Sequence, residues 1–213
     1  MKRIYCIIVT LIWAFAAFAQ NPEEIVNRMT EVWEEHEKEG IVMTMDTKIP
    51  IVGTVTATEY ALENKSRTEA KILGSQIITW DDGVTEWEYS SKDNKVTIKS
   101  IATDSSASVE SDDDDSMFGD IVKGYDFSLK KETADDWTIE LKKNKSNKDK
   151  DAPKTMEFKI AKKTYYLITL KTKMSGISVT MRDISFGVKE ETVTFNIKDY
   201  PGATVVDERN KSK

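Results

Sequence analysis

Cysteine and histidine are almost absent from this chain of 213 residues, which has one of each, Cys6 and His36. Cys6 lies in an N-terminal stretch that we expect to be removed, so the remaining chain has no disulfide and no thiolate chemistry. A single histidine without a second histidine or a usable cysteine does not make a zinc site. We therefore expect no metal, and we place His36 in the last turn of a helix, where an imidazole suits the helix dipole.

Catalytic motifs are also missing. The sequence has no Ser-His-Asp set, no glycine-rich phosphate loop and no H-E-x-x-H pattern. Its 37 acidic residues outnumber its 31 basic residues, which gives a net charge of -6 and disfavours non-specific binding of nucleic acid. We expect a protein that is not an enzyme, has no cofactor and does not bind nucleic acid. A glycan hydrolase with a pair of Asp or Glu side chains is the enzymatic alternative.

Long apolar runs are confined to the N-terminus. Lys2 and Arg3 precede an almost unbroken apolar run from Ile7 to Ala19, and Ala17-Phe18-Ala19 fits the small-x-small rule for cleavage. The run is short for a membrane span of about 20 residues, so we favour a signal peptide over an uncleaved anchor. We predict that residues 1–19 are a signal peptide cleaved after Ala19, and that residues 20–213 form a single exported domain.

The mature chain begins with a helix pattern and continues with strand patterns. Asn21 suits a helix cap and Pro22 the first turn, apolar residues then recur at helical spacing as far as His36, and Gly40 ends the helix. After Gly40 the apolar period changes from 3.6 to 2. The clearest alternating runs are Val96–Ile98, Phe127–Leu129, Trp137–Leu141, Met156–Ile160, Tyr166–Leu170, Ile177–Met181 and Val193–Ile197.

Alternation gives each strand one apolar and one polar face, and short turns favour antiparallel pairing. About ten strands that share one apolar face must curl, because something has to cover that face. We predict an α+β, mainly antiparallel β fold: a strongly curved open half-barrel sheet wrapped around the N-terminal helix and a short lid helix at Met117–Val122. Its concave face is predicted to carry Val96, Ile98, Trp137, Ile139, Phe158, Ile160 and Ile168.

Two polar segments interrupt the strand patterns. The acidic segment Asp104–Ser116 includes the run Asp112–Asp115, which lacks the spacing and the glycine of a calcium loop. We interpret it as a solvated loop; Asp115-Ser116-Met117 also fits a short bacterial O-glycosylation pattern. The lysine-rich segment Lys142–Lys154 is likewise predicted to be a solvated loop.

The stretch "DDGVTEWEYSSKDNKVTI", which begins at Asp81, follows the leader, the helix and the first strands. Together with "VTFNIKDYPGATVVD", which begins at Val193, it resembles the LolA-like family of periplasmic lipoprotein carriers. The matching features are Asp82-Gly83, Trp87, Tyr89, the strand from Lys95, and a closing strand followed by Pro-Gly and a short apolar strand. A third, weaker match is Arg67, which stands where the family has an arginine before the Asp-Gly turn, but the usual aromatic companions are replaced by Thr68 and Glu69.

The resemblance implies a periplasmic carrier, or chaperone, that binds the acyl chains of lipoproteins or a related lipid between sheet and helices and shuttles them towards the outer membrane. It implies a monomer that meets an inner-membrane release complex and an outer-membrane acceptor. Burial of each methylene is worth about 0.8 kcal/mol, so such binding needs no catalytic residue. The predicted cavity residues, each of which is also suited to an ordinary core, are Trp33, Met45, Trp80, Trp87, Tyr89, Val96, Ile98, Trp137, Ile139, Phe158, Ile160 and Ile168.

Two alternatives stay open at this point. Arg67 is either a surface charge paired with Glu63 or Glu69, or a gate inside the cavity that hydrogen-bonds helix carbonyls when the lid is closed. The protein as a whole is either a carrier or a periplasmic interaction or sensor module of the same fold. A carrier needs an open apolar cavity, whereas a module without transport activity should fill that space with side chains.

Overall fold

The computed structural model describes residues 21–51, 53–101, 118 and 122–209. The predicted signal peptide, the acidic run Asp112–Asp115 and most of the predicted lid helix lie outside these residues. The helices are α2 (Pro22–Glu37), α3 (Glu190–Val193) and the 3-10 helix η2 (Ile197–Asp199). The strands are β1 (Ile41–Ile49), β2 (Gly53–Leu62), β3 (Lys65–Ile72), β4 (Ser75–Asp81), β5 (Thr85–Ser90), β6 (Lys95–Ser100), β7 (Tyr125–Glu132), β8 (Asp136–Lys143), β9 (Thr155–Ala161), β10 (Leu167–Met174), β11 (Ile177–Phe186) and β12 (Thr204–Asp207).

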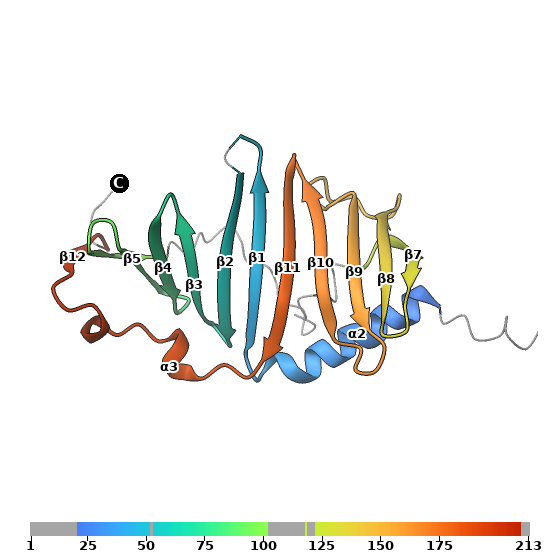
Figure 1. The fold of residues 1–213 in the computed structure, drawn as a ribbon, viewed down its shortest axis with the longest axis horizontal. Coiled ribbons are helices and arrows are strands. Elements are labelled where there is room, and N and C mark those ends of the chain that lie inside the picture. The colour runs from blue at the N-terminus through green and yellow to red at the C-terminus, as the bar shows by residue number, and fades with distance from the viewer. Residues whose placement is uncertain (1–20, 52, 102–117, 119–121, 210–213) are drawn as a thin grey trace, which may run out of the picture.

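All twelve strands form one sheet, in the order β12-β6-β5-β4-β3-β2-β1-β11-β10-β9-β8-β7 (Figure 1). Ten of the neighbouring pairs are antiparallel, and the short strand β12 pairs with β6 in parallel. The sheet is open, because β12 and β7 are at its two ends. The prediction of a mainly antiparallel open sheet is confirmed. The two meanders β1–β6 and β7–β11 are joined at the centre by the pairing of β1 with β11.

Helix α2 forms where the sequence predicts it. The Asn21 side chain accepts a hydrogen bond of 3.1 Å from the Glu23 N–H, and Pro22 occupies the first turn. The helix buries one stripe of side chains against the sheet: Ile25, Val26, Met29, Thr30, Val32 and Trp33. Gly40 follows with a φ of +80°, and a Cβ there would lie 2.6 Å from Val188 Cβ, so no larger residue fits.

The sheet has two apolar regions on opposite faces. Following the strand register from β8 to β1, Ile139, Phe158, Leu170, Met181 and Met45 are successive partners, and all lie on the face that α2 covers. Continuing from Met45 on that same face, the register passes through Ala57, Ala70, Ile77, Ser90 and Lys95. The large apolar side chains of β4–β6 therefore point to the other face, and the predicted single concave apolar face is wrong.

We call these sides the α2 face and the C-terminal face. The C-terminal face of β3–β6 is covered by the segment between β11 and β12. There Lys65 of β3 pairs with Glu190 of α3 at 2.6 Å, and Trp80 and Trp87 contact Phe195. Figure 1 shows this segment running from the end of β11 past α3 to β12, while α2 crosses the other half of the sheet.

Two local predictions need correction. The predicted strand Val193–Ile197 is not a strand: its residues are divided between the end of α3, an extended stretch and η2, because this segment packs across a sheet face instead of joining an edge. Ile168 is exposed and does not share the α2 face. The pairing of β9 with β10 shifts between Leu167 and Thr169, and this irregularity gives the buried positions to Leu167 and Leu170.

Candidate functional site

The α2 face of β1 and β7–β11 forms the larger apolar cluster, which we call the α2 core. Trp33 of α2 meets Phe118 edge-to-face at a centroid distance of 4.8 Å, and Phe118 meets Phe158 of β9 at 5.9 Å. Trp33 also contacts Phe186 at 5.6 Å. These aromatic rings join the helix to the sheet through apolar contacts.

Methionine is unusually frequent in the α2 core. Met29, Met43, Met156 and Met181 are buried there, and Met45 packs against them from β1. A thioether side chain has three rotatable bonds and fills irregular space, so such a core changes its packing more easily than one built from β-branched residues. The α2 core is therefore well suited to reshaping around an apolar ligand.

The indole nitrogen of Trp33 is a buried polar atom in the α2 core. The Trp33 ring is 2 % exposed, and its Nε1–H has no hydrogen-bond acceptor among the residues that the structure describes. An unsatisfied buried donor costs about 1–3 kcal/mol, so the closed arrangement carries a penalty that an acceptor on a bound molecule would remove. Trp33 Nε1–H is therefore the group of the α2 core best placed to donate a hydrogen bond to a bound molecule.

The polar side chains of α2 form their ion pairs and hydrogen bonds mainly with residues of the helix itself or of the segments beside it. Arg28 pairs with Glu31 at 2.5 Å, and His36 Nδ1 lies 2.7 Å from a Glu39 carboxylate oxygen. His36 Nε2 shares a hydrogen bond of 3.1 Å with the Tyr166 hydroxyl, and the His36 ring stacks on Phe186. His36 thus lies in the last turn of α2, as predicted, and links the helix to the start of β10.

Glu59 lies at the border of the α2 core. It is the register partner of Met43 on β1, so its side chain is on the α2 face. Burial raises the pKa of the Glu59 carboxyl above its ordinary value. The apolar surroundings at this border therefore disfavour the charged form of the Glu59 carboxyl.

The structure divides the predicted cavity residues into three groups. Six lie in or against the α2 core: Trp33, Met45, Trp137, Ile139, Phe158 and Ile160. Five lie on the opposite face under the C-terminal segment, contrary to the prediction: Trp80, Trp87, Tyr89, Val96 and Ile98. The twelfth, Ile168, is exposed.

The aromatic residues of the C-terminal face form a cluster of their own. Trp80 and Trp87 are directly opposite each other on β4 and β5, and Phe195 stacks on Trp87 at 5.5 Å. Tyr200 contacts Trp80 at 5.6 Å and Tyr89 at 4.3 Å. The aromatic residues around the Asp-Gly turn therefore hold the C-terminal segment in place.

Arg67 belongs to this second cluster. Its guanidinium lies 5.4 Å from the ring centroid of Trp80 and 5.7 Å from that of Tyr60, and it pairs with Glu69 at 2.7 Å. The gate hypothesis, in which Arg67 faces a cavity beneath α2, is wrong because the side chain is on the opposite face. The predicted pair with Glu69 is confirmed. The charge is not simply on the surface, since Nε is buried and has no hydrogen-bond partner within the described part of the chain.

Both clusters contain residues that were not predicted as site residues. Phe195 was predicted only as part of the alternating strand Val193–Ile197. Tyr200 stands just before Pro201-Gly202, where an aromatic residue indicates a packed segment as readily as a strand. Leu167 was missed because the irregularity in β10 displaces it from the strict period of two. Leu141 and Met156 were recognised as alternating residues but not as members of the candidate site.

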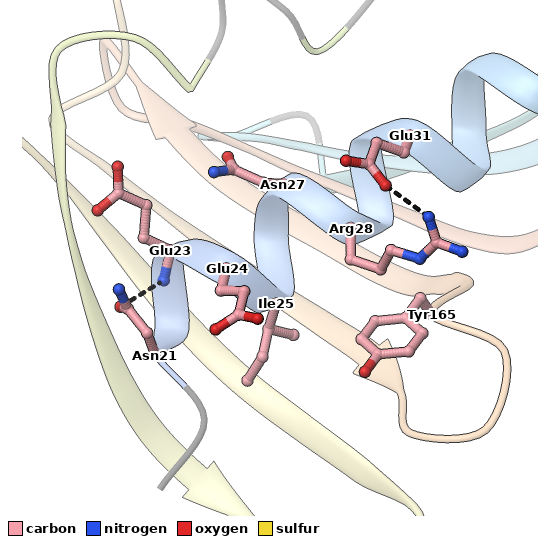
Figure 2. A pocket seen from close by; sticks show the side chains of 8 residues that line it. All are labelled: Asn21, Glu23, Glu24, Ile25, Asn27, Arg28, Glu31 and Tyr165. Atoms are coloured by element: carbon pink, nitrogen blue, oxygen red, sulfur yellow. Dashed lines mark hydrogen bonds and ion pairs between the residues drawn. The ribbon is translucent and has the colours of Figure 1, made fainter.

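Several hollows open on the described surface. Figure 2 shows one of about 450 Å³ at the start of α2, with polar lining residues that include Glu23, Arg28 and Tyr165. Others of about 560, 750 and 1090 Å³ lie along the lysine-rich segment between β8 and β9. Within the α2 core, the described side chains of α2 and the sheet pack against one another.

Among the residues that the structure describes, no helix is long and apolar enough to cross a membrane. The same residues include no group of three or more His, Cys, Asp or Glu side chains arranged to hold a metal ion.

Known proteins provide a comparison for this fold. No family model and no curated protein matches the sequence. Among solved structures, the lipoprotein LppX of Mycobacterium tuberculosis is 13% identical, with 76% of this chain and 92% of LppX covered and a TM-score of 0.52. The fold is LolA-like.

Two further solved structures have lower TM-scores. LprF of Mycobacterium bovis is 10% identical, with 79% of this chain and 97% of LprF covered and a TM-score of 0.46. A LolA superfamily protein of Nitrosomonas europaea is 10% identical, with 83% and 99% covered and a TM-score of 0.30. The LolA-like fold predicted from the sequence is confirmed as a fold, and at these identities the similarity does not extend to function.

Proposed function

We propose that this protein is a periplasmic, non-enzymatic carrier that binds the acyl chains of a lipoprotein, or a related lipid, between α2 and the sheet. In this proposal it takes the chains from a release complex at the inner membrane and passes them to an acceptor at the outer membrane. The observation that carries the proposal is the α2 core, which is rich in methionine and contains the unsatisfied Trp33 Nε1–H.

An acyl chain enters this site by displacing α2. Each methylene that leaves water contributes about 0.8 kcal/mol, and the methionine side chains repack around the chain. The ester or amide carbonyl that joins an acyl chain to its carrier molecule accepts the Trp33 Nε1–H bond. The ligand therefore supplies both the apolar surface and the acceptor that the closed core lacks.

Closure of α2 makes the binding reversible. The closed helix buries its own stripe on the same strands, so it competes with the ligand for one apolar surface. The ligand's apparent affinity is reduced by the free energy needed to open the helix. A carrier of this kind holds its cargo in water and yields it to an acceptor that binds the acyl chain more strongly.

The experiment compares two fluorescent probes of equal chain length, one a fatty acid methyl ester and one the corresponding alkane. The folded protein is expected to bind both, since about 300 Å² of buried apolar surface contributes about 7 kcal/mol before association costs. Trp33→Phe removes the donor and keeps the ring, so it should weaken ester binding about 3–10-fold and leave alkane binding unchanged. Trp80→Phe on the opposite face is the matched control and should change neither.

Two results would count against the carrier. One is a folded protein that binds neither probe; the other is equal weakening by Trp33→Phe and Trp80→Phe. Native mass spectrometry of protein isolated from its own periplasm adds an independent measurement, because bound acyl cargo should appear as an added mass that organic solvent removes.

The packing of the α2 core favours a second candidate function, an interaction or sensor module without transport activity. Such a module needs no space for a ligand, and the described side chains of the α2 core pack against one another. Probe binding distinguishes the two functions, because the module should bind a protein partner while excluding both probes.

A further inference from the structure

The end of β8 and the segment that leads to β9 concentrate positive charge in an acidic protein. Residues 142–154, of which Lys142 and Lys143 belong to β8, contain six lysines and two aspartates, whereas the whole chain has a net charge of -6. Lys173, at the end of β10, borders the same hollow as Lys143, Lys150 and Lys154. The charge is therefore gathered at one rim of the sheet, where the β8–β9 and β10–β11 connections lie (Figure 1).

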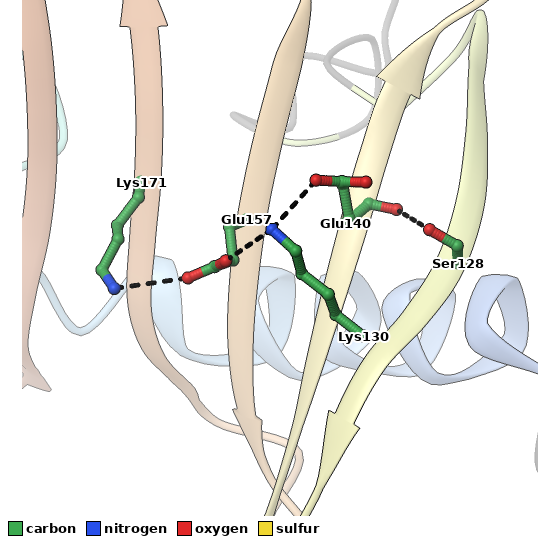
Figure 3. A network of polar contacts seen from close by, with 5 residues as sticks. All are labelled: Ser128, Lys130, Glu140, Glu157 and Lys171. Carbon is green, nitrogen blue, oxygen red and sulfur yellow. Dashed lines mark hydrogen bonds and ion pairs between the residues drawn. The ribbon is translucent and has the colours of Figure 1, made fainter.

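These lysines differ from those on the C-terminal face of the same strands. Figure 3 shows Lys130 between Glu140 and Glu157, at 3.0 and 3.2 Å, and Lys171 at 3.3 Å from Glu157. Within the described residues, by contrast, no lysine of 142–154 pairs with a carboxylate, and neither does Lys173. Lys143 and Lys148 donate to backbone carbonyls, which leaves their charge uncompensated.

The β1–β2 and β10–β11 turns, which carry apolar side chains, lie next to the lysines of the β8–β9 connection. Gly176 at the β10–β11 turn is in contact range of Pro50 at the β1–β2 turn, since a Cβ on the glycine would lie 3.9 Å from Pro50 Cγ. Met174 borders a hollow of about 560 Å³ together with Ala152 and Pro153. The β1–β2, β10–β11 and β8–β9 connections thus form one continuous surface, which we call the basic rim: Pro50, Ile51, residues 143–154 and residues 173–177.

Ile51 is the outermost apolar residue of the basic rim. Its side chain is fully exposed, and its φ of +72° lies in the left-handed region that β-branched residues rarely adopt. Asparagine or glycine would suit this backbone better, and the isoleucine makes no compensating burial. Neither the packing nor the local backbone of the folded protein accounts for an isoleucine at this position.

We propose that the basic rim is a docking surface for an anionic lipid bilayer. The unpaired lysines attract the negatively charged headgroups, each contributing about fivefold to the partition coefficient near such a surface. Ile51 and Met174, at the tips beside them, enter the interface between headgroups and acyl chains. Nucleic acid would bind the same positive charge but would make no use of the exposed isoleucine.

Docking at this rim leaves α2 uncovered. Figure 1 shows α2 crossing near the opposite rim, where the helix leads through Gly40 into β1. The inference is therefore independent of the acyl-chain site, and each can fail alone. Together they would hold a carrier at a membrane while the helix stays free to open.

The test measures co-sedimentation of the mature protein with vesicles of phosphatidylcholine that contain about 30 % phosphatidylglycerol, against vesicles of phosphatidylcholine alone. We expect binding to the anionic vesicles at low salt and its loss in about 0.5 M salt. The triple variant Lys145→Gln, Lys150→Gln and Lys173→Gln should bind about 100-fold more weakly. The control Lys163→Gln, Lys189→Gln and Lys198→Gln removes the same charge from exposed positions elsewhere and should bind nearly as the wild type does.

The apolar tip is tested separately. Ile51→Asn should weaken vesicle binding severalfold while the melting temperature stays equal or rises, because asparagine tolerates the left-handed backbone. Leu73→Asn is the matched control: Leu73 is equally exposed and has a φ of +50°. It lies on the β3–β4 hairpin, at the same edge of the sheet but outside the basic rim. Equal losses for Ile51→Asn and Leu73→Asn would overturn the assignment to the basic rim.

Three other outcomes would also overturn the proposal. They are no binding to anionic vesicles at low salt, equal weakening by the two triple variants, and binding to heparin with an affinity equal to that for vesicles and unaffected by Ile51→Asn. The last outcome would identify a general polyanion site. Acyl-probe binding should be unchanged in all rim variants, so a failure here is distinguishable from a failure of the proposed carrier function.

Discussion

The two halves of the sheet bury opposite faces. In the α2 half, β1 and β7–β11 pack their apolar side chains against a helix from the N-terminal end of the chain. In the C-terminal half, β3–β6 pack theirs against the segment that follows β11. β2 lies between them, with Ala57 and Glu59 on the α2 face and Tyr60 on the C-terminal face.

The two covers also differ in chemistry. The α2 core combines flexible methionines with a donor that lacks an acceptor, whereas the C-terminal cluster consists of stacked aromatic rings, a cation over two of them and ion pairs. Under the proposed carrier function, the first cover opens and the second stays in place. The two covers can differ in this way because each lies on its own face of the sheet.

The largest expected effect is in the α2 half. Phe158→Ala removes a fully buried ring from the centre of the α2 core, and such truncations cost about 3–5 kcal/mol. Urea unfolding followed by circular dichroism should show this loss of stability together with loss of acyl-probe binding. A loss below about 1 kcal/mol would mean that the α2 core is loosely packed even when closed.

A smaller effect is expected from the C-terminal cover. Phe195→Ala removes a half-buried ring that stacks on Trp87, so we expect a loss of about 1–2 kcal/mol in unfolding free energy. Acyl-probe affinity should not change, because the ring is on the other face of the sheet. A parallel decrease in probe affinity would show that the two halves are coupled.

Arg67→Met should change stability by about 1 kcal/mol or less. It removes the ion pair with Glu69 and the contact over Trp80, but it also removes the unsatisfied Nε. Lipid retention and transfer to acceptor vesicles should equal those of the wild type. Tighter retention would restore a gating role for this arginine, despite its position.

The smallest effect concerns Glu59 and depends on pH. Burial raises the pKa of Glu59, so the folded state prefers the neutral acid. The contribution of the neutral Glu59 carboxyl to stability is therefore present at low pH and is lost as the pH rises through the folded-state pKa. Glu59→Gln mimics the neutral form. It should be more stable than the wild type at pH 7.5 by about 0.5 kcal/mol, with the difference vanishing near pH 4. Thermal melts across this range measure the difference.

The strands were predictable from the sequence, but the face that each strand buries was not. Alternation marks Trp80 and Phe158 equally as apolar positions and contains no information about which side of the sheet each faces, since a period of two is symmetric. The face depends on the cover, and the C-terminal segment was taken for a strand. Short local sequence signals predicted structure more reliably than the alternation predicted faces. The Asn21-Pro22 helix start, the Asp82-Gly83 turn and the short strand after Pro201-Gly202, Thr204–Asp207, are all present.

The candidate site was predictable only in part, for the same reason. Trp33 could be placed on the buried stripe of α2 from helical spacing alone. Arg67 could not be placed, because its neighbours on β3 alternate between charged and small residues and favour neither face. Ile168 was misplaced by an irregularity in strand pairing that has no glycine or proline to mark it.

The central pairing of β1 with β11 has a consequence for how the chain folds. The two meanders are built from neighbouring hairpins, whose loops close quickly, but β1 and β11 are separated by the whole of both meanders. The join that makes one sheet out of two therefore forms late, and it requires β11, near the end of the chain. Until β11 has left the ribosome, β1 has an unpaired edge, so a chaperone that shields this edge would have its greatest effect on this protein during synthesis.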